Sequence, residues 1–203
     1  QTHKRNLLID FVAVLARALT RRGNRVGAIL YSDRLPRVIP AGTGRAHVLR
    51  LIKDVQSQPA QKRAPLTDLS TLMEAGISTC RRRSLVFILS DFISSPGWEK
   101  PLGMLGQRHE VLAVRLYDPR ETELPDVGSL VLEDAETGEQ LFVDTHDGGF
   151  RSRFAEAARR REYEIGVAFA RAGADVMAIS TEDDLAKEIV DAAFRVHTTL
   201  GPG

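Results

Sequence analysis

Ser84–Phe92, with the sequence SLVFILSDF, is the stretch on which the predicted fold depends. Its apolar part, Leu85–Leu89, is continuous and is bounded by polar residues on both sides. A run of this kind is typical of a strand buried on both faces, as in a parallel sheet covered by helices. The run ends at Asp91, and the carboxyl ends of parallel strands line the ligand crevice of an open sheet. We therefore expect Asp91 to lie where a carboxylate can take part in chemistry, bind a metal or cap a helix.

Helical and strand patterns alternate along the rest of the chain. Apolar residues spaced three and four apart predict helices over residues 4–22, 46–55, 67–80, 98–106, 149–172 and from 181 onward. Apolar runs predict strands over residues 26–31, 35–39, 110–116 and 175–179, and two short apolar segments around a glycine predict a β-hairpin over 128–144. This order predicts an α/β fold in a single domain over residues 1–203, with a doubly wound, mostly parallel sheet, helices on both faces and an inserted hairpin.

The composition argues against several classes of function. The formal net charge of +1 gives no overall field that would favour nucleic acid or an acidic membrane surface. The lone Cys80 excludes an internal disulfide and favours a reducing, cytoplasmic compartment. No apolar run reaches the ~20 residues of a membrane span, and no signal peptide opens the chain, so we expect no membrane contact from this segment. Because a helix begins almost directly after Gln1, we expect a fragment or a processed product.

Thr67 and Asp91 form the strongest candidate site. Thr67 begins a predicted helix after a loop, and Asp91 ends the predicted buried strand, so both are expected at the carboxyl edge of the sheet. A hydroxyl and a carboxylate at one edge are oxygen ligands that suit Mg²⁺, directly or through water. Helix capping explains both residues as well, because Thr67 fits an N-cap and Asp91 fits a cap or a loop carboxylate. The pattern leaves the metal site and the two caps open as alternatives.

Four segments in series resemble a bacterial protein family. They are Gly23–Ala28, Thr67–Leu69, Leu85–Phe92 and Arg115–Pro119. Together they are similar to the von Willebrand factor A-like proteins in family fifty-eight of the domains of unknown function, which are often encoded beside MoxR-type AAA+ ATPases. The resemblance covers nearly the whole chain. It implies a metal-ion-dependent adhesion site in which Thr67 and Asp91 are ligands of Mg²⁺ or another divalent cation.

The chain departs from this family at its first strand. The Asp-x-Ser-x-Ser motif that supplies the main metal ligands of the family is absent, and the chain starts at the helix that would follow it. The resemblance therefore implies a domain that lacks its first, central strand, with strand order 3-2-1-4-5-6 around an empty lane. We expect weak or no Mg²⁺ binding by this segment, and possible self-association through exposed sheet edges.

Other polar residues are assigned structural roles. His47 and His109 stand next to apolar segments and are expected to be structural histidines with satisfied hydrogen bonds. Arg81–Arg83 suit the negative end of a helix, although they would also suit an acidic partner. Asp144–Asp147 lie between the hairpin and a helix, so a turn with a helix N-cap is expected there.

The resemblance implies a non-enzymatic adaptor that binds proteins through a metal-bridged site. Its expected partners are a MoxR-type AAA+ ATPase and the client of that ATPase, with no nucleic acid. One alternative is a metal-assisted hydrolase or phosphotransferase that uses Asp91 and Asp118 at strand ends. Another is an interaction domain without metal. No nucleophile–base pair is apparent in the sequence, which favours a protein that is not an enzyme.

Overall fold

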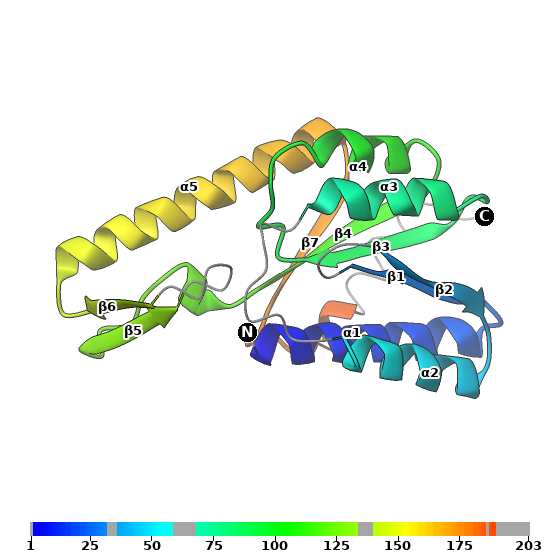
Figure 1. The fold of residues 1–203 in the computed structure, drawn as a ribbon, viewed down its shortest axis with the longest axis horizontal. Coiled ribbons are helices and arrows are strands. Elements are labelled where there is room, and N and C mark those ends of the chain that lie inside the picture. The colour runs from blue at the N-terminus through cyan, green and yellow to red at the C-terminus, as the bar shows by residue number, and fades with distance from the viewer. Residues whose placement is uncertain (1, 32–35, 59–67, 134–139, 186, 190–203) are drawn as a thin grey trace.

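The structure is a computed structural model that describes residues 2–31, 36–58, 68–133, 140–185 and 187–189 (Figure 1). Its helices and strands follow in the order α1 (Thr2–Arg21), β1 (Val26–Leu30), β2 (Arg37–Gly42), α2 (Arg45–Gln56), α3 (Leu69–Thr79), β3 (Leu85–Ser90), α4 (Glu99–Gly106), β4 (Glu110–Tyr117), the 3₁₀ turn η1 (Pro119–Glu121), β5 (Ser129–Glu133), β6 (Gln140–Asp144), α5 (Gly148–Ala172) and β7 (Asp175–Ser180).

A parallel three-stranded sheet in the order β3-β4-β7 forms the middle of the molecule. Helices α3, α4 and α5 cover one face, and α1 covers the other, with α2 beside it (Figure 1). Side chains of β4 alternate between these layers, because successive residues of a strand point to opposite faces. Ala113 packs with the first layer, and Leu112 and Val114 pack against α1. The predicted α/β fold with a doubly wound sheet is confirmed.

Two antiparallel hairpins complete the described strands. Strand β1 pairs with β2, and β5 pairs with β6 between β4 and β7 in the sequence, as the predicted insertion requires. Within the described residues, β1 and β3 are not joined by a strand ladder, because each belongs to a different sheet. The family resemblance implies a gap between β1 and β3, where the missing strand would lie. Direct pairing of β1 with β3 would close this gap, and it is not seen among the described residues. The absence of a central strand from the domain stays a prediction.

Leu85–Leu89 packs into a core on each face of the sheet, as predicted. Val86 and Ile88 join the core with α3 and α4, and Phe87 and Leu89 join the core with α1, but burial of the strand is incomplete. Only Ile88 of strand β3 is buried, whereas five consecutive residues of β4 are buried. The reason is the position of each strand. Strand β4 has neighbours on both sides, and β3 is an edge of the three-stranded sheet in the described part of the chain. An apolar run indicates that a strand is suited to burial, but strand order decides how much burial it receives.

Two predicted boundaries also differ from the structure. The second strand was expected over residues 35–39 but is Arg37–Gly42, because its ladder with β1 runs from Leu30 opposite Arg37 to Val26 opposite Gly42. The third helix begins at Leu69, and its N-cap is Asp68, whose carboxylate accepts hydrogen bonds from the Ser70 amide and the Thr71 hydroxyl, both at 2.9 Å. The helix expected from residue 181 onward lies mostly outside the described residues.

Candidate functional site at the carboxyl edge of the sheet

Asp91 follows β3 directly and lies at the carboxyl edge of the sheet, as expected. One carboxylate oxygen accepts a hydrogen bond from the Lys4 ammonium at 3.1 Å, and the other accepts one from the Ile93 amide at 3.1 Å. The same ammonium lies 2.6 Å from a carboxylate oxygen of Glu121. The Lys4 side chain is only 17 % exposed, whereas each carboxylate is 36 % exposed. Lys4 therefore bridges two carboxylates that remain accessible from solvent.

The environment of Lys4 favours its charged form. Burial by itself would lower the pKa of the ammonium, because it removes water from the charge. The negative charge of Asp91 and the hydrogen bond to Glu121 act in the opposite direction and prevail, so the pKa of Lys4 is raised above its ordinary value. No local pattern indicates this role, because Lys4 is 87 residues from Asp91 and lies on a helix whose periodicity reports only its apolar face.

The backbone directly after Asp91 is strained. Phe92 has a φ angle of 58°, in the left-handed region that a bulky residue rarely adopts. Its ring is buried and packs against the rings of Trp98 and Phe169, with centroids 5.4 and 4.7 Å away. This aromatic packing offsets the cost of the strained turn and fixes the direction in which the Asp91 carboxylate points. Trp98 anchors helix α4 through its contacts with the rings of Phe92 and Phe169.

Arg115, on strand β4, stabilises the carboxyl edge of the sheet next to Asp91. Its guanidinium is almost fully buried and makes a bidentate ion pair with Glu162 of α5. A further N–H donates to the backbone carbonyl of Asp91 at 3.4 Å, and the guanidinium lies over the ring of Tyr117. The end of β3, the end of β4 and helix α5 are thereby joined at one residue.

Of the predicted metal ligands, only Asp91 lies in the described part of the structure. Thr67 lies outside the described residues, so the expected approach of Thr67 to Asp91 stays a prediction. Both Asp91 oxygens already accept hydrogen bonds, and one of them faces the Lys4 ammonium. Within the described residues, no three His, Cys, Asp or Glu side chains are placed to hold a metal ion. These side chains therefore do not fit a divalent cation by themselves, because a metal at Asp91 would have to displace Lys4.

Asp118, the second carboxylate of the hydrolase alternative, forms a cap. It is the N-cap of η1, where it accepts a hydrogen bond from the Arg120 amide at 3.0 Å. Its side chain also lies 3.7 Å from the Arg120 guanidinium, and the Glu121 carboxylate completes a capping box by accepting from the Asp118 amide. Asp147 is likewise the N-cap of α5, as the Asp144–Asp147 pattern predicted.

The two histidines assigned structural roles behave differently. The Nε2 atom of His47 lies 2.7 Å from the carbonyl oxygen of Val26, so the prediction for His47 is confirmed. The prediction for His109 is wrong, since neither ring nitrogen of this buried residue has a hydrogen-bond partner among the described residues. His109 closes the turn between α4 and β4, and a pattern of apolar neighbours cannot reveal whether a polar partner is within reach.

The β5–β6 hairpin carries an exposed apolar pair. Val131 and Phe142 lie opposite each other across the ladder, and the Phe142 side chain is 79 % exposed. Figure 1 shows that this hairpin projects from the body of the molecule together with the N-terminal half of α5. The chain reaches it from the carboxyl end of β4 through η1, which holds Glu121. Among the described helices, none combines the length and the apolar character needed to cross a membrane.

Two solved structures resemble this fold. The crystal structure of an aerotolerance-related membrane protein from Bacteroides fragilis matches with a TM-score of 0.57 at 9% identity, over 95% of this chain and 89% of that one. That of the conserved hypothetical protein BatB from Bacteroides thetaiotaomicron matches with a TM-score of 0.54 at 10% identity, over 97% of this chain and 87% of that one. At such low identity these likenesses show the fold alone.

Curated relatives come from mycobacteria. Uncharacterized proteins of Mycobacterium bovis and Mycobacterium tuberculosis are each 33% identical over 187 residues, which is 92% of this chain. This chain spans 59% of the length of these two relatives. An uncharacterized protein of Mycobacterium avium is 36% identical over 152 residues, which is 75% of this chain and 89% of that protein. The model of one family matches residues 1–164, so the chain belongs to the family described as protein of unknown function DUF58.

Proposed function

We propose that this chain is a protein-binding module, not an enzyme, and that it works as an adaptor for a MoxR-type AAA+ ATPase and its client. The observation that carries the proposal is the exposed pair of Val131 and Phe142 on the projecting hairpin. Interfaces are typically apolar at their centre and polar at their rim. The pair supplies an apolar centre, and Asp91 and Glu121, partly exposed at the carboxyl edge of the sheet from which the chain leads to the hairpin, supply polar groups for a rim.

The bonding of the edge carboxylates supports a role without catalysis. Asp91 holds Lys4 and a backbone amide, and Asp118 caps a turn. Carboxylates committed in this way stabilise structure, whereas a general acid or base needs a free oxygen within reach of a substrate proton. The family resemblance suggests the identity of the partner, and the single Cys80 suits the cytoplasm as the compartment.

A metal ion is not part of this proposal. The resemblance implies that a divalent cation at Asp91 would bind a carboxylate of the partner. The described side chains do not fit such a cation, because the Lys4 ammonium already occupies the Asp91 carboxylate. Partner recognition in this proposal runs through apolar contact at the hairpin and direct charge contact at Asp91 and Glu121. Lys4 orients both carboxylates for such contact.

The test is direct binding between the purified full-length protein and the MoxR-type ATPase encoded in the same genome, measured by biolayer interferometry. Phe142→Ser is expected to weaken binding by about tenfold or more, since an exposed aromatic at an interface centre contributes about 2 kcal/mol. Leu49→Ser is the matched control, because Leu49 is 56 % exposed on α2, away from the hairpin. Unchanged binding by Phe142→Ser, or equal losses in both variants, would contradict the proposal.

A further inference from the structure

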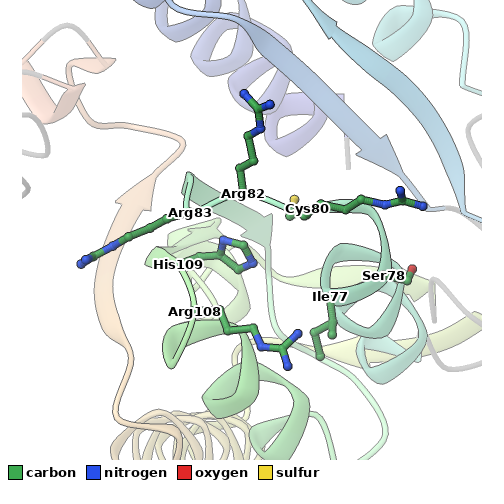
Figure 2. Close-up of a pocket in the computed structure, with 8 residues that line it drawn as sticks. Ile77, Ser78, Cys80, Arg82, Arg83, Arg108 and His109 are labelled. Atoms are coloured by element: carbon green, nitrogen blue, oxygen red, sulfur yellow. The ribbon is translucent and has the colours of Figure 1, made fainter.

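A cavity of about 550 Å³ lies at the end of β3 opposite to Asp91. It is formed where helix α3 passes into β3 and where α4 passes into β4 (Figure 2). Its lining is strongly basic and consists of Ile77, Ser78, Cys80, Arg81, Arg82, Arg83, Arg108 and His109. A volume of this size is in the range of small-molecule sites, ~300–1,000 Å³.

Most of the positive charge in the lining is uncompensated. Arg83 makes an ion pair with Glu110. Arg81, Arg82 and Arg108 are exposed and make no ion pair within the described part of the chain. Figure 2 shows Arg82 and Arg83 directed away from each other and Arg108 running toward Ile77. These exposed guanidinium groups point in different directions and would turn toward a shared anion, which attracts all of them.

His109 is a second and independent indication of a ligand. Its ring lies in the middle of the group (Figure 2), and the residue is only 5 % exposed. Neither Nδ1 nor Nε2 has a hydrogen-bond partner among the described residues. An imidazole always has at least one N–H donor, and a buried donor without a partner is costly. The floor of the basic cavity therefore offers a polar group that a bound anion can satisfy after small movements of the side chains around it.

Cys80 does not supply the chemistry of a reactive thiol here. Burial raises the pKa of its thiol, because removal of water disfavours the thiolate. At neutral pH the residue therefore adds no negative charge to the cavity and is a poor nucleophile. The lining as a whole is suited to binding.

We propose that this cavity binds a small anion that carries a diphosphate group, either inorganic diphosphate or a nucleoside diphosphate. Guanidinium groups recognise phosphate oxygens through paired N–H donors, and Arg81, Arg82 and Arg108 come from two segments of the lining, so together they can engage both phosphate groups of a diphosphate. The cavity is a local hollow at the turn before β3, which favours a small molecule over a polymer. This site is at the other end of β3 from the proposed partner-binding edge. A negative result for one proposal would therefore leave the other unaffected.

The test is isothermal titration calorimetry of the full-length protein with sodium pyrophosphate and, in a second arm, with ADP, at about 150 mM salt to screen weak surface binding. The double variant Arg82→Gln, Arg108→Gln is expected to weaken pyrophosphate binding by about a hundredfold, at about tenfold for each charged hydrogen-bonding group. The matched control is Arg159→Gln, Arg161→Gln, which removes the same charge from exposed positions of α5 and should leave binding unchanged.

His109→Leu gives an independent readout at the floor of the cavity. It places an apolar side chain of similar size at this buried position, and circular dichroism and a melting curve of the variant show whether it folds. It is expected to weaken pyrophosphate binding severalfold, and in the wild type the His109 ring signals should shift in NMR spectra on addition of pyrophosphate.

Binding of ADP tighter than pyrophosphate would identify a nucleotide as the source of the diphosphate, and the reverse order would identify the free anion. No pyrophosphate or ADP binding by the wild type, or equal losses in the two double variants, would overturn the proposal. Tighter binding of a single-stranded oligonucleotide than of either probe would overturn it in favour of a polymer.

Discussion

At the scale of single residues, Lys4 determines the character of the carboxyl edge. It is the cation between Asp91 and Glu121, and it ties the start of the chain to the ends of β3 and β4. Buried charges are stable only when they are paired and hydrogen-bonded, and Lys4 meets both conditions. Its removal would leave two neighbouring carboxylates without their shared cation.

Lys4→Met is expected to lower the free energy of unfolding by about 1–2 kcal/mol at pH 7, a value reduced because both carboxylates are partly exposed to solvent. The raised pKa of Lys4 fixes the sign of the pH dependence. Its contribution is complete below the pKa that lysine has in the unfolded chain, about 10.4, and is lost as the pH rises through the higher folded value. Urea unfolding of both proteins between pH 7 and pH 11.5 measures this.

The wild type and Lys4→Met should therefore differ by a constant amount up to about pH 10 and converge above it. Lys53→Met is the control, because Lys53 is exposed on α2. A difference that is absent at pH 7, or that does not shrink in alkaline solution, would show that the ammonium is not what stabilises this edge.

At the scale of elements, α5 is attached to the rest of the molecule by a polar contact and by a buried apolar face. The ion pair of Arg115 with Glu162 joins α5 to β4, and Phe169 joins it to the aromatic cluster behind Asp91. The guanidinium is buried and therefore depends on its partner, whereas Glu162 is partly exposed. A second glutamate of α5, Glu164, makes an ion pair with Arg160 on the exposed surface of the same helix.

Glu162→Gln is expected to lower the free energy of unfolding by about 1–3 kcal/mol, because it leaves the buried Arg115 charge without its counterion. Glu164→Gln on the same helix should change it by less than about 0.5 kcal/mol, since exposed pairs contribute little. Chemical denaturation of both variants at pH 7 checks the contrast. Equal effects of the two substitutions would mean that the buried pair does not hold α5 in place.

At the scale of the whole molecule, the described strands form separate sheets with open edges. Strand β1 pairs only with β2, and β3 pairs only with β4, among the residues that the structure describes. An open edge presents unpaired backbone N–H and C=O groups, which favour pairing with a further strand.

Residues 1–203 on their own are therefore expected to associate or to melt at a lower temperature than a chain extended at its N-terminus with the natural sequence. Light scattering coupled to size-exclusion chromatography and thermal melts of both proteins test this. A monomeric, cooperatively melting 1–203 segment that gains nothing from the extension would show that a central strand does not belong between β1 and β3.

The sequence by itself determined the fold class, the inserted hairpin and the place of Asp91. Periodicity and apolar runs report on local structure, and the carboxyl end of a parallel strand has a defined position in any open sheet. The N-cap of α5 at Asp147 was predictable for the same reason, because its carboxylate accepts a hydrogen bond from the Gly149 amide only two residues further on.

Tertiary structure alone decided the rest. The edge position of β3, the bridging role of Lys4 and the unpartnered ring of His109 depend on which segments meet, and these contacts join residues far apart in the chain. Local patterns do not encode such contacts, because the strength of a charge interaction depends on distance and burial in the folded molecule. The position of Asp91 after β3 was therefore predictable, but its bonding, through an ammonium shared with Glu121, followed only from the packing of α1 beside β4.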